Sequence, residues 1–187
     1  MKISISPTAV LFLVLLTAKG YWPLPAALLA ALFHECGHML AATLLGVKIA
    51  RMEIDLFGAK LTPAGLLPSY KAELLLALAG PLFSLLLAAF TIPFSSTFAV
   101  YLRDATFSFA IFNLLPICDF DGGRMLHACL APRLSLQAAD RVLLITSYAC
   151  LLLLFLFSSC LMLRYGQNPT LTVIAASLFA KLFILKA

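Results

Sequence analysis

The chain has 187 residues, of which 63% are hydrophobic and only 11% are charged, and its mean hydropathy is +1.06. Soluble globular domains are about half apolar and about one quarter charged, so this composition excludes an ordinary soluble protein and indicates a multi-pass membrane protein. The net charge of +5 comes from basic residues that are spread singly along the chain, not gathered in a patch. We therefore expect the lipid bilayer as a partner and no nucleic acid.

Six apolar segments fill nearly the whole sequence, and each is close to the length of about 20 residues that crosses a bilayer. Their approximate bounds are 3–22, 24–46, 71–93, 98–116, 142–163 and 170–185. We expect an all-α polytopic membrane protein with about six transmembrane helices, forming a single domain over residues 1–187.

The second apolar segment contains His34-Glu35-Cys36-Gly37-His38, the pattern H-E-x-x-H. Residues four apart on a helix lie on the same face, so the imidazoles of His34 and His38 can bind one Zn²⁺. Glu35 lies beside them and can take a proton from a metal-bound water. Because ionisable residues at membrane depth are costly and usually functional, a metal site in a membrane helix is the leading hypothesis.

A short segment after this span has a different pattern. Gly46 is expected to end the helix. Residues 47–56 then alternate apolar and polar side chains, a period of two that predicts a β-strand, and Gly58 and residues 62–65 are turn signals. We expect a small β-hairpin or strand region after the second span. An irregular amphipathic loop on the membrane surface is the alternative.

The distribution of basic residues predicts the orientation in the membrane. With the N-terminus inside, ten of the 13 Lys and Arg residues fall on the inner side and three on the outer side. Cytoplasmic loops carry the excess of positive charge, so both termini are expected to be cytoplasmic. In this topology the second and fourth spans both run inward and deliver the H-E-x-x-H helix and Asp121 to the same leaflet.

Catalytic zinc usually has three protein ligands and one open position, so the two histidines need a partner. Four candidates follow the fourth span: Cys118, Asp119, Asp121 and His127. Asp121 precedes two glycines, where the backbone can bend sharply and approach a metal. Spacing alone does not separate Asp121 from Asp119, whereas His127 and Cys118 are less favoured.

Three motifs occur in order: H-E-x-x-H in a membrane span, A-G-P at residues 79–81 in a later span, and N-x-x-P from Asn113 followed by D-G-G from Asp121. Together they resemble the site-2 protease family of intramembrane zinc metalloproteases, and most of all its compact branch that contains the stage IV sporulation protein FB. The resemblance implies that His34, His38 and Asp121 are the zinc ligands. It also implies that Glu35 is the general base and that Asn113 positions the substrate or polarises its carbonyl.

Two positions depart from the pattern of that family. The family often has Asn three residues after A-G-P, where this chain has Ser84, so no role is assigned to Ser84. It often has Pro two residues before the aspartate of D-G-G, where this chain has Asp119. The CBS domain common in the compact branch is not expected within residues 1–187, and neither is a PDZ domain.

The expected function is that of a zinc metalloendopeptidase, with one Zn²⁺ per site, that cleaves membrane-anchored protein substrates within or next to a transmembrane segment. One alternative is a membrane metal or ion transporter that uses the same His and Asp residues, for which Glu35 would not be needed as a base. The other is a catalytically silent membrane scaffold, although structural zinc sites usually have four protein ligands and only three are evident. The sequence identifies neither a substrate nor a regulatory membrane partner.

Overall fold

The computed structural model describes residues 2–7, 10, 14, 23–55, 58–65, 68–166 and 170–186. The chain divides into two compact units, Met1–Leu114 and Leu115–Ala187. The first contains the H-E-x-x-H helix and the A-G-P motif, and the second contains the D-G-G motif. That the whole chain acts as one domain stays a prediction.

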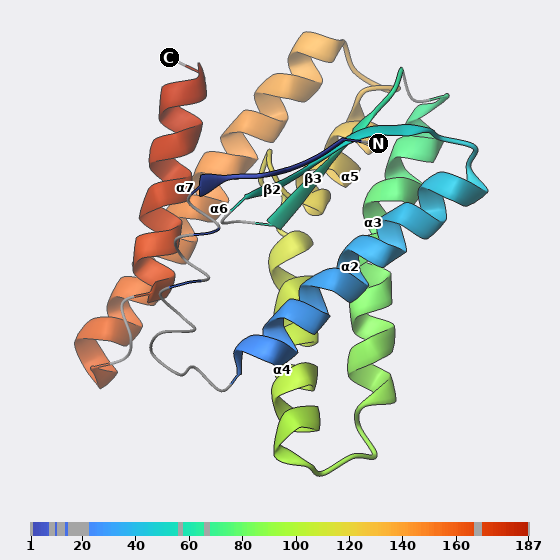
Figure 1. Cartoon of the computed structure of the whole chain (residues 1–187). Coiled ribbons are helices and arrows are strands. Elements are labelled where there is room, and N and C mark those ends of the chain that lie inside the picture. The colour runs from blue at the N-terminus through green and yellow to red at the C-terminus, as the bar shows by residue number, and fades with distance from the viewer. Residues whose placement is uncertain are drawn as a thin grey trace. The chain divides into compact units, whose positions relative to one another are not determined.

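Three helices of the first unit pack against one another: α2 (Leu24–Leu44), α3 (Tyr70–Phe90) and α4 (Thr97–Asn113) (Figure 1). The hydroxyl oxygens of Ser69 and Ser96 accept hydrogen bonds from backbone N–H groups in the first turns of α3 and α4, at 3.1 and 3.3 Å. Such caps satisfy N–H groups that have no partner inside a helix, so they fix where each helix begins.

Small residues let these helices approach closely. The buried residues of α2 include a row at intervals of four, which is Ala26, Ala30, His34, His38 and Ala42. The buried residues of α3 include a second such row, which is Ala72, Leu76, Gly80, Ser84 and Ala88. Rows of this spacing are the ridges by which helices most commonly pack, and small side chains shorten the distance between helices in membranes. Both histidines therefore belong to the packing face of α2.

Gly46 ends α2 in the way that the sequence predicts. Its φ of 67° is in the left-handed region, which glycine adopts without steric cost. The N–H of Gly46 donates to the carbonyl of Thr43 at 3.1 Å, and the N–H of Val47 donates to the carbonyl of Ala42 at 2.8 Å. This pair of bonds is the Schellman arrangement, and it turns the chain toward the strand that follows.

The strand region predicted after the second span is a three-stranded sheet in the order β1-β2-β3. β2 (Ile49–Asp55) and β3 (Gly58–Pro63) pair antiparallel, and Asp55 lies opposite Gly58. The hairpin is therefore confirmed over the irregular loop. Pro63 closes β3 and does not form the turn that the sequence suggested, because the pairing continues to the Ile49–Pro63 position.

The N-terminal strand, β1, corrects the predicted start of the first span. That span was expected from residue 3, whereas Lys2–Ile5 form β1, which pairs parallel with β2. This short stretch alternates polar and apolar residues, which suits a strand, but its partner lies about 50 positions along the chain and no local pattern reveals it. Residues 8–9, 11–13 and 15–22 of the predicted span lie outside the described residues.

In the described part of the second unit there are three helices, α5 (Asp121–Leu130), α6 (Leu136–Tyr165) and α7 (Thr170–Lys186). α6 packs against α5 and against α7. It begins at Ser135, whose hydroxyl oxygen accepts from the N–H of Ala138 at 3.2 Å, and it ends at Gly166, which has a φ of 61°. α5 is absent from the predicted spans because its 10 residues are too few to cross a bilayer.

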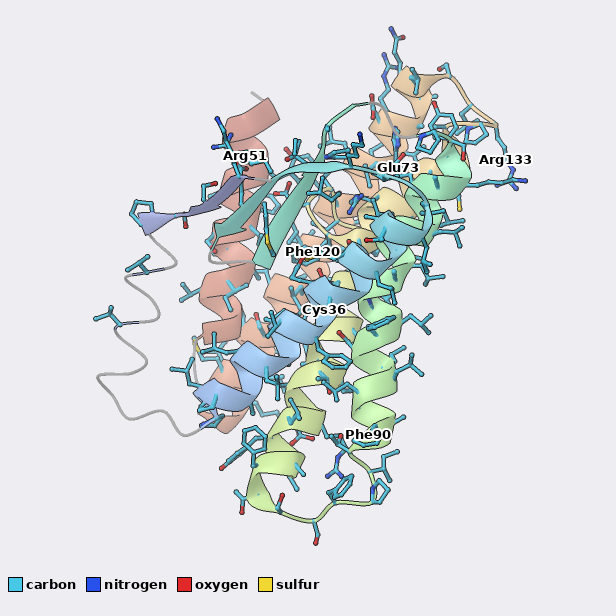
Figure 2. All side chains as sticks on the ribbon, turned by 45° about the vertical axis from the view of Figure 1, so that its right-hand side comes forward. Cys36, Arg51, Glu73, Phe90, Phe120 and Arg133 are labelled. Carbon is cyan, nitrogen blue, oxygen red and sulfur yellow. The ribbon has the colours of Figure 1, made fainter. Side chains whose placement is uncertain are left out.

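Among the described residues, three helical segments are long and apolar enough to cross a membrane: Leu24–Leu44, Tyr70–Phe90 and Leu136–Arg164. They correspond to the second, third and fifth predicted spans. Large apolar side chains are exposed on them, for example Phe90, which is 69% exposed at the end of α3 (Figure 2). In a membrane such side chains contact lipid, which accounts for the unusual exposure of apolar surface. The count of six spans stays a prediction.

Candidate metal centre

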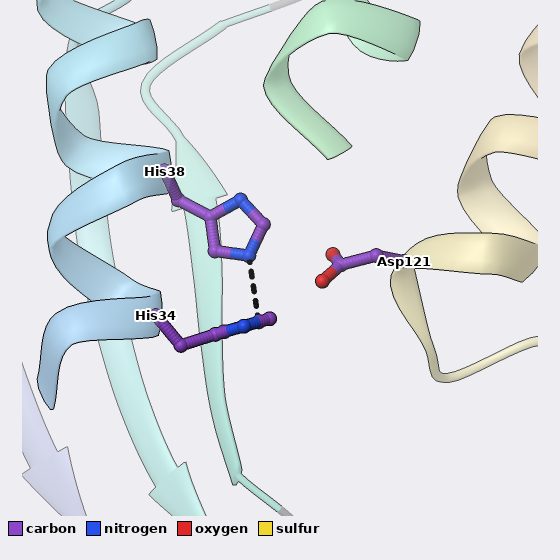
Figure 3. Close-up of side chains that lie close together, drawn as sticks. All are labelled: His34, His38 and Asp121. Carbon is purple, nitrogen blue, oxygen red and sulfur yellow. Dashed lines mark hydrogen bonds between the residues drawn. The ribbon is translucent and has the colours of Figure 1, made fainter. Parts of the chain in front are cut away.

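His34 and His38 lie on the buried face of α2, where they are 2% and 4% exposed. Their Nε2 atoms are 3.2 Å apart, and Figure 3 marks this hydrogen bond. Of the residues between them, Glu35 is half-buried, with its Oε2 atom shielded from solvent, and Cys36 is exposed (Figure 2). The helix thus brings the two predicted ligands together on one face, as the spacing of four residues requires.

The Nδ1 atoms of both imidazoles lie within hydrogen-bond distance of groups on α3. Nδ1 of His38 lies 2.7 Å from the backbone carbonyl oxygen of Leu76, and Nδ1 of His34 lies 3.0 Å from the hydroxyl of Ser84. A carbonyl only accepts, so Nδ1 of His38 carries a proton and donates it. The two Nε2 atoms are then the nitrogens left facing each other. Partners of this kind on the second nitrogen are what orient metal-binding histidines.

Gly80 of the A-G-P motif leaves the space next to the Nε2 atoms. A Cβ atom at this position would collide with Nε2 of His38, and it would lie 2.6 Å from Cε1 of His38 and 2.8 Å from Nε2 of His34. Gly37 has the complementary role on α2, since a Cβ there would lie 2.6 Å from the carbonyl oxygen of Ala79. These two glycines allow the helices to approach closely beside the two Nε2 atoms, an arrangement that fits a small cation.

α4 also reaches the histidines. The ring of Phe109 lies 5.9 Å from the ring of His34, measured between centroids. The side-chain amide of Asn113, the last residue of α4, donates to the carbonyl of Phe109 at 3.0 Å. Asn113 therefore lies one turn along α4 from a residue that contacts His34, and one N–H of its amide is engaged by its own helix.

Asp121 is the first residue of α5 in the second unit and is 6% exposed (Figure 3). One of its carboxylate oxygens, Oδ1, lies 3.5 Å from Nη1 of Arg124, one turn along the same helix. Asp119, its rival by spacing, is exposed. A buried carboxylate needs a positive partner or hydrogen bonds, and Arg124 supplies part of that requirement.

The turn before Asp121 depends on Gly123 and on Ser147. A Cβ atom at Gly123 would collide with the carbonyl oxygen of Ile117 and lie 2.6 Å from its carbonyl carbon, so only glycine permits this close approach of backbone. The hydroxyl of Ser147 in α6 accepts from the N–H of Cys118 at 2.9 Å and donates to the carbonyl of Leu143 at 2.6 Å. Together these contacts fix the first turn of α5 against α6.

The two less favoured ligand candidates have contacts of their own in the second unit. Sγ of Cys118 lies 3.2 Å from the hydroxyl of Ser147. Nε2 of His127 lies 3.4 Å from Oδ1 of Asp140 in α6. Both side chains therefore contact residues of α6. The sequence also favours these two residues less than Asp121 and Asp119 as metal ligands.

Sequence reasoning missed the groups that orient the imidazoles. By family pattern Ser84 is only a departure from the usual Asn, yet its position four residues after Gly80 places it on the same face of α3. That periodicity was the signal that could have pointed to it. The carbonyl of Leu76 left no signal, because any residue type supplies a backbone carbonyl.

Comparisons with known proteins identify relatives of this chain. The family described as Peptidase M50B-like matches residues 7–117, which is more than half of the chain. The chain is also 34% identical over 128 residues to the "Putative zinc metalloprotease Rip3" of two strains of Mycobacterium tuberculosis. That match covers 62% of this chain and 32% of the relative, so it spans about a third of the length of these relatives.

A solved structure, the site-2 protease from Methanocaldococcus jannaschii, is similar to this chain with a TM-score of 0.73. The likeness covers 97% of this chain and 90% of that one at 23% sequence identity, so it shows the fold. The described residues include three helices that are long and apolar enough to cross a membrane, and the chain is an integral membrane protein with the site-2 protease fold. The family match contains both the H-E-x-x-H helix and the A-G-P helix, and the chain belongs to the Peptidase M50B-like family.

Proposed function

We propose that this chain is an intramembrane metalloendopeptidase that cleaves membrane-anchored proteins within or next to a transmembrane segment. The observation that carries the proposal is the pair of buried imidazoles on an apolar helix, with Nε2 atoms 3.2 Å apart and Glu35 beside them. Membership of the Peptidase M50B-like family supports the same reaction class.

The proposed cofactor is one Zn²⁺ held by His34, His38 and Asp121. Each of the three residues offers one ligand atom, an imidazole nitrogen or a carboxylate oxygen, and all three are buried. Two imidazole nitrogens and one carboxylate oxygen, with a fourth position left open for water or substrate, form one of the usual catalytic zinc sites. The burial of Asp121 and the exposure of Asp119 favour Asp121 as the third ligand.

When bound, zinc lowers the pKa of water and polarises a carbonyl oxygen. Glu35 then accepts the proton of the attacking water and delivers it to the leaving amine, the role of a general base followed by a general acid. The amide of Asn113 retains a second N–H beyond the one given to Phe109, and that group would donate to the oxyanion that develops on the substrate.

The substrate must present an extended peptide, because a helical segment shields its own peptide bonds. We propose that the sheet accepts such a segment as an added strand, since β1 and β3 lie at its two edges. The lipid bilayer is the second partner.

The proposed topology has six spans with both termini in the cytoplasm and the two compact units working as one intramembrane domain. The ten-to-three distribution of Lys and Arg residues supports this orientation. It would place the end of α2 and the D-G-G motif toward the same leaflet, where water reaches the reacting bond.

A panel of tagged single-span proteins, expressed with this chain in membranes, tests the proposal. The Glu35→Gln variant removes the base, and we expect cleavage to fall by about 10²- to 10⁴-fold at matched expression and zinc content. Cys36→Ser, a change at the exposed position next to it, is the matched control and should cleave as the wild type does.

The rival functions give different outcomes. Equal cleavage by wild type and Glu35→Gln would contradict the role of Glu35. Metal flux that persists in Glu35→Gln, with no cleavage by the wild type, would instead support a transporter. Zinc bound without cleavage or flux would support a silent scaffold.

A further inference from the structure

We infer that Ser84 is a positioning residue for the metal ligand His34, and that its hydroxyl donates a hydrogen bond in the metal-free protein and accepts one in the metal-loaded protein. This inference rests on the proposed metal site and deepens it. Nothing in the sequence assigned a role to Ser84.

The geometry places Ser84 directly behind the ligand. Its side chain is fully buried, at 0% exposed, on the row of α3 that packs against α2. Its hydroxyl oxygen lies 3.0 Å from Nδ1 of His34, the nitrogen on the far side of the ring from Nε2. A buried hydroxyl requires a partner, so this contact constrains both groups.

The two imidazoles are held by partners of different chemistry. The carbonyl of Leu76 can only accept, so the proton on Nδ1 of His38 is fixed there, and its Nε2 offers a lone pair. With one proton on each ring, the 3.2 Å contact between the Nε2 atoms then requires His34 to donate from Nε2. Nδ1 of His34 is left without a proton, and the hydroxyl of Ser84 donates to it.

Metal binding reverses this arrangement at His34 alone. Both Nε2 atoms must present lone pairs to an ion, so the proton of His34 must lie on Nδ1 instead. Nδ1 then donates, and the hydroxyl of Ser84 accepts. A hydroxyl can take either role, whereas a carbonyl or a methyl group cannot. Ser84 therefore keeps the ring of His34 in one place while its proton changes position, and no proton is gained or lost.

Zinc affinity of the full chain, purified in detergent and measured by competition with a coloured chelator, tests this role. Ser84→Ala removes the partner of Nδ1 and should weaken zinc binding about 10- to 100-fold, the usual effect of losing the second partner of a ligand. Ser84→Thr keeps the hydroxyl and should restore most of the affinity. The absorption spectrum of the Co²⁺-loaded protein should change in Ser84→Ala, since it reports the geometry of the ligands.

Thr106 provides the matched control. It is also fully buried in the first unit, and its hydroxyl donates to the carbonyls of Leu102 and Arg103 in its own helix, at 2.8 and 3.0 Å. Thr106→Val removes an equally buried hydroxyl that contacts only its own helix in the bonds described above, and it should leave zinc affinity and the Co²⁺ spectrum unchanged.

The inference is overturned if Ser84→Ala binds zinc as tightly as the wild type, or if Thr106→Val weakens binding as much as Ser84→Ala does. If the wild type binds zinc, neither of these results contradicts the proposed function. A wild-type chain that binds no zinc overturns both the role of Ser84 and the proposed metalloprotease.

Discussion

The two regions that supply the proposed ligands achieve their positions by different means. In the first unit, long helices carry the histidines, and the buried rows of α2 and α3, at intervals of four, consist mostly of small residues. In the second unit, a short turn ending at Asp121 is set by one close backbone approach at Gly123 and by the hydroxyl of Ser147.

Ligands on a helix are easier to recognise in a sequence than a ligand in a turn. A helix repeats its geometry, so two ligands four residues apart must share a face. A turn has no such repeat, and its shape depends on contacts with residues far along the chain, such as Ser147 for the turn at Cys118. The first region is specified locally, and the second is specified by its neighbours.

Gly80→Ala should have the largest effect, because it fills the space beside the nitrogen donors of the first region. The added methyl group would collide with Nε2 of His38, and backbone and ring would have to move. Overpacking of this kind costs up to about 3 kcal/mol, or about 100-fold in zinc affinity if it acts on binding. Zinc competition on the purified chain measures the loss.

Gly65→Ala is the control for this change, because nothing lies within 4 Å of a Cβ atom at that position. Its zinc affinity should equal that of the wild type. Wild-type affinity in Gly80→Ala would mean that the space beside Gly80 is not used by an ion.

Gly123→Ala disturbs the second region and should have an intermediate effect. The obstacle is the backbone carbonyl of Ile117, which cannot rotate away as a side chain does, so the first turn of α5 must shift with Asp121. We expect a loss of about 1.4 kcal/mol in zinc binding, or about 10-fold. If Gly123→Ala abolishes helical structure but Gly80→Ala does not, the turn is needed for folding beyond its part in the site.

Much of the first region could be predicted from the sequence, and less of the second. The H-E-x-x-H helix, its end at Gly46 and the hairpin after it follow from local patterns, and the structure confirms them. The pairing of β1 with β2 could not be predicted, because it joins residues that are distant in the chain.

The candidate metal centre could likewise be predicted only in part from the sequence. Glu35 and the two histidines could be found by spacing, whereas the contacts of their rings with Leu76 and Ser84 arise only when α2 packs on α3. In the second unit, spacing could not rank Asp121 above Asp119, and the difference in burial appears only in the folded structure.

His127→Gln should have the smallest effect, because it changes a histidine outside the proposed site. His127 contacts Asp140, whose side chain is 62% exposed, so the pair is screened by water and contributes less than about 1 kcal/mol. The temperature of thermal unfolding should change little, and the zinc content should not change. Loss of zinc in His127→Gln would make His127 a ligand after all.

The proposed zinc site takes its three ligands from His34, His38 and Asp121. Its most direct test is the number of zinc ions bound per chain, measured by elemental analysis of the purified protein after dialysis, for the wild type, Asp121→Asn and Asp119→Asn. We expect one ion in the wild type and in Asp119→Asn, and a large loss in Asp121→Asn. One tightly bound ion in Asp121→Asn, or its loss in Asp119→Asn, would show that Asp121 is not the third ligand.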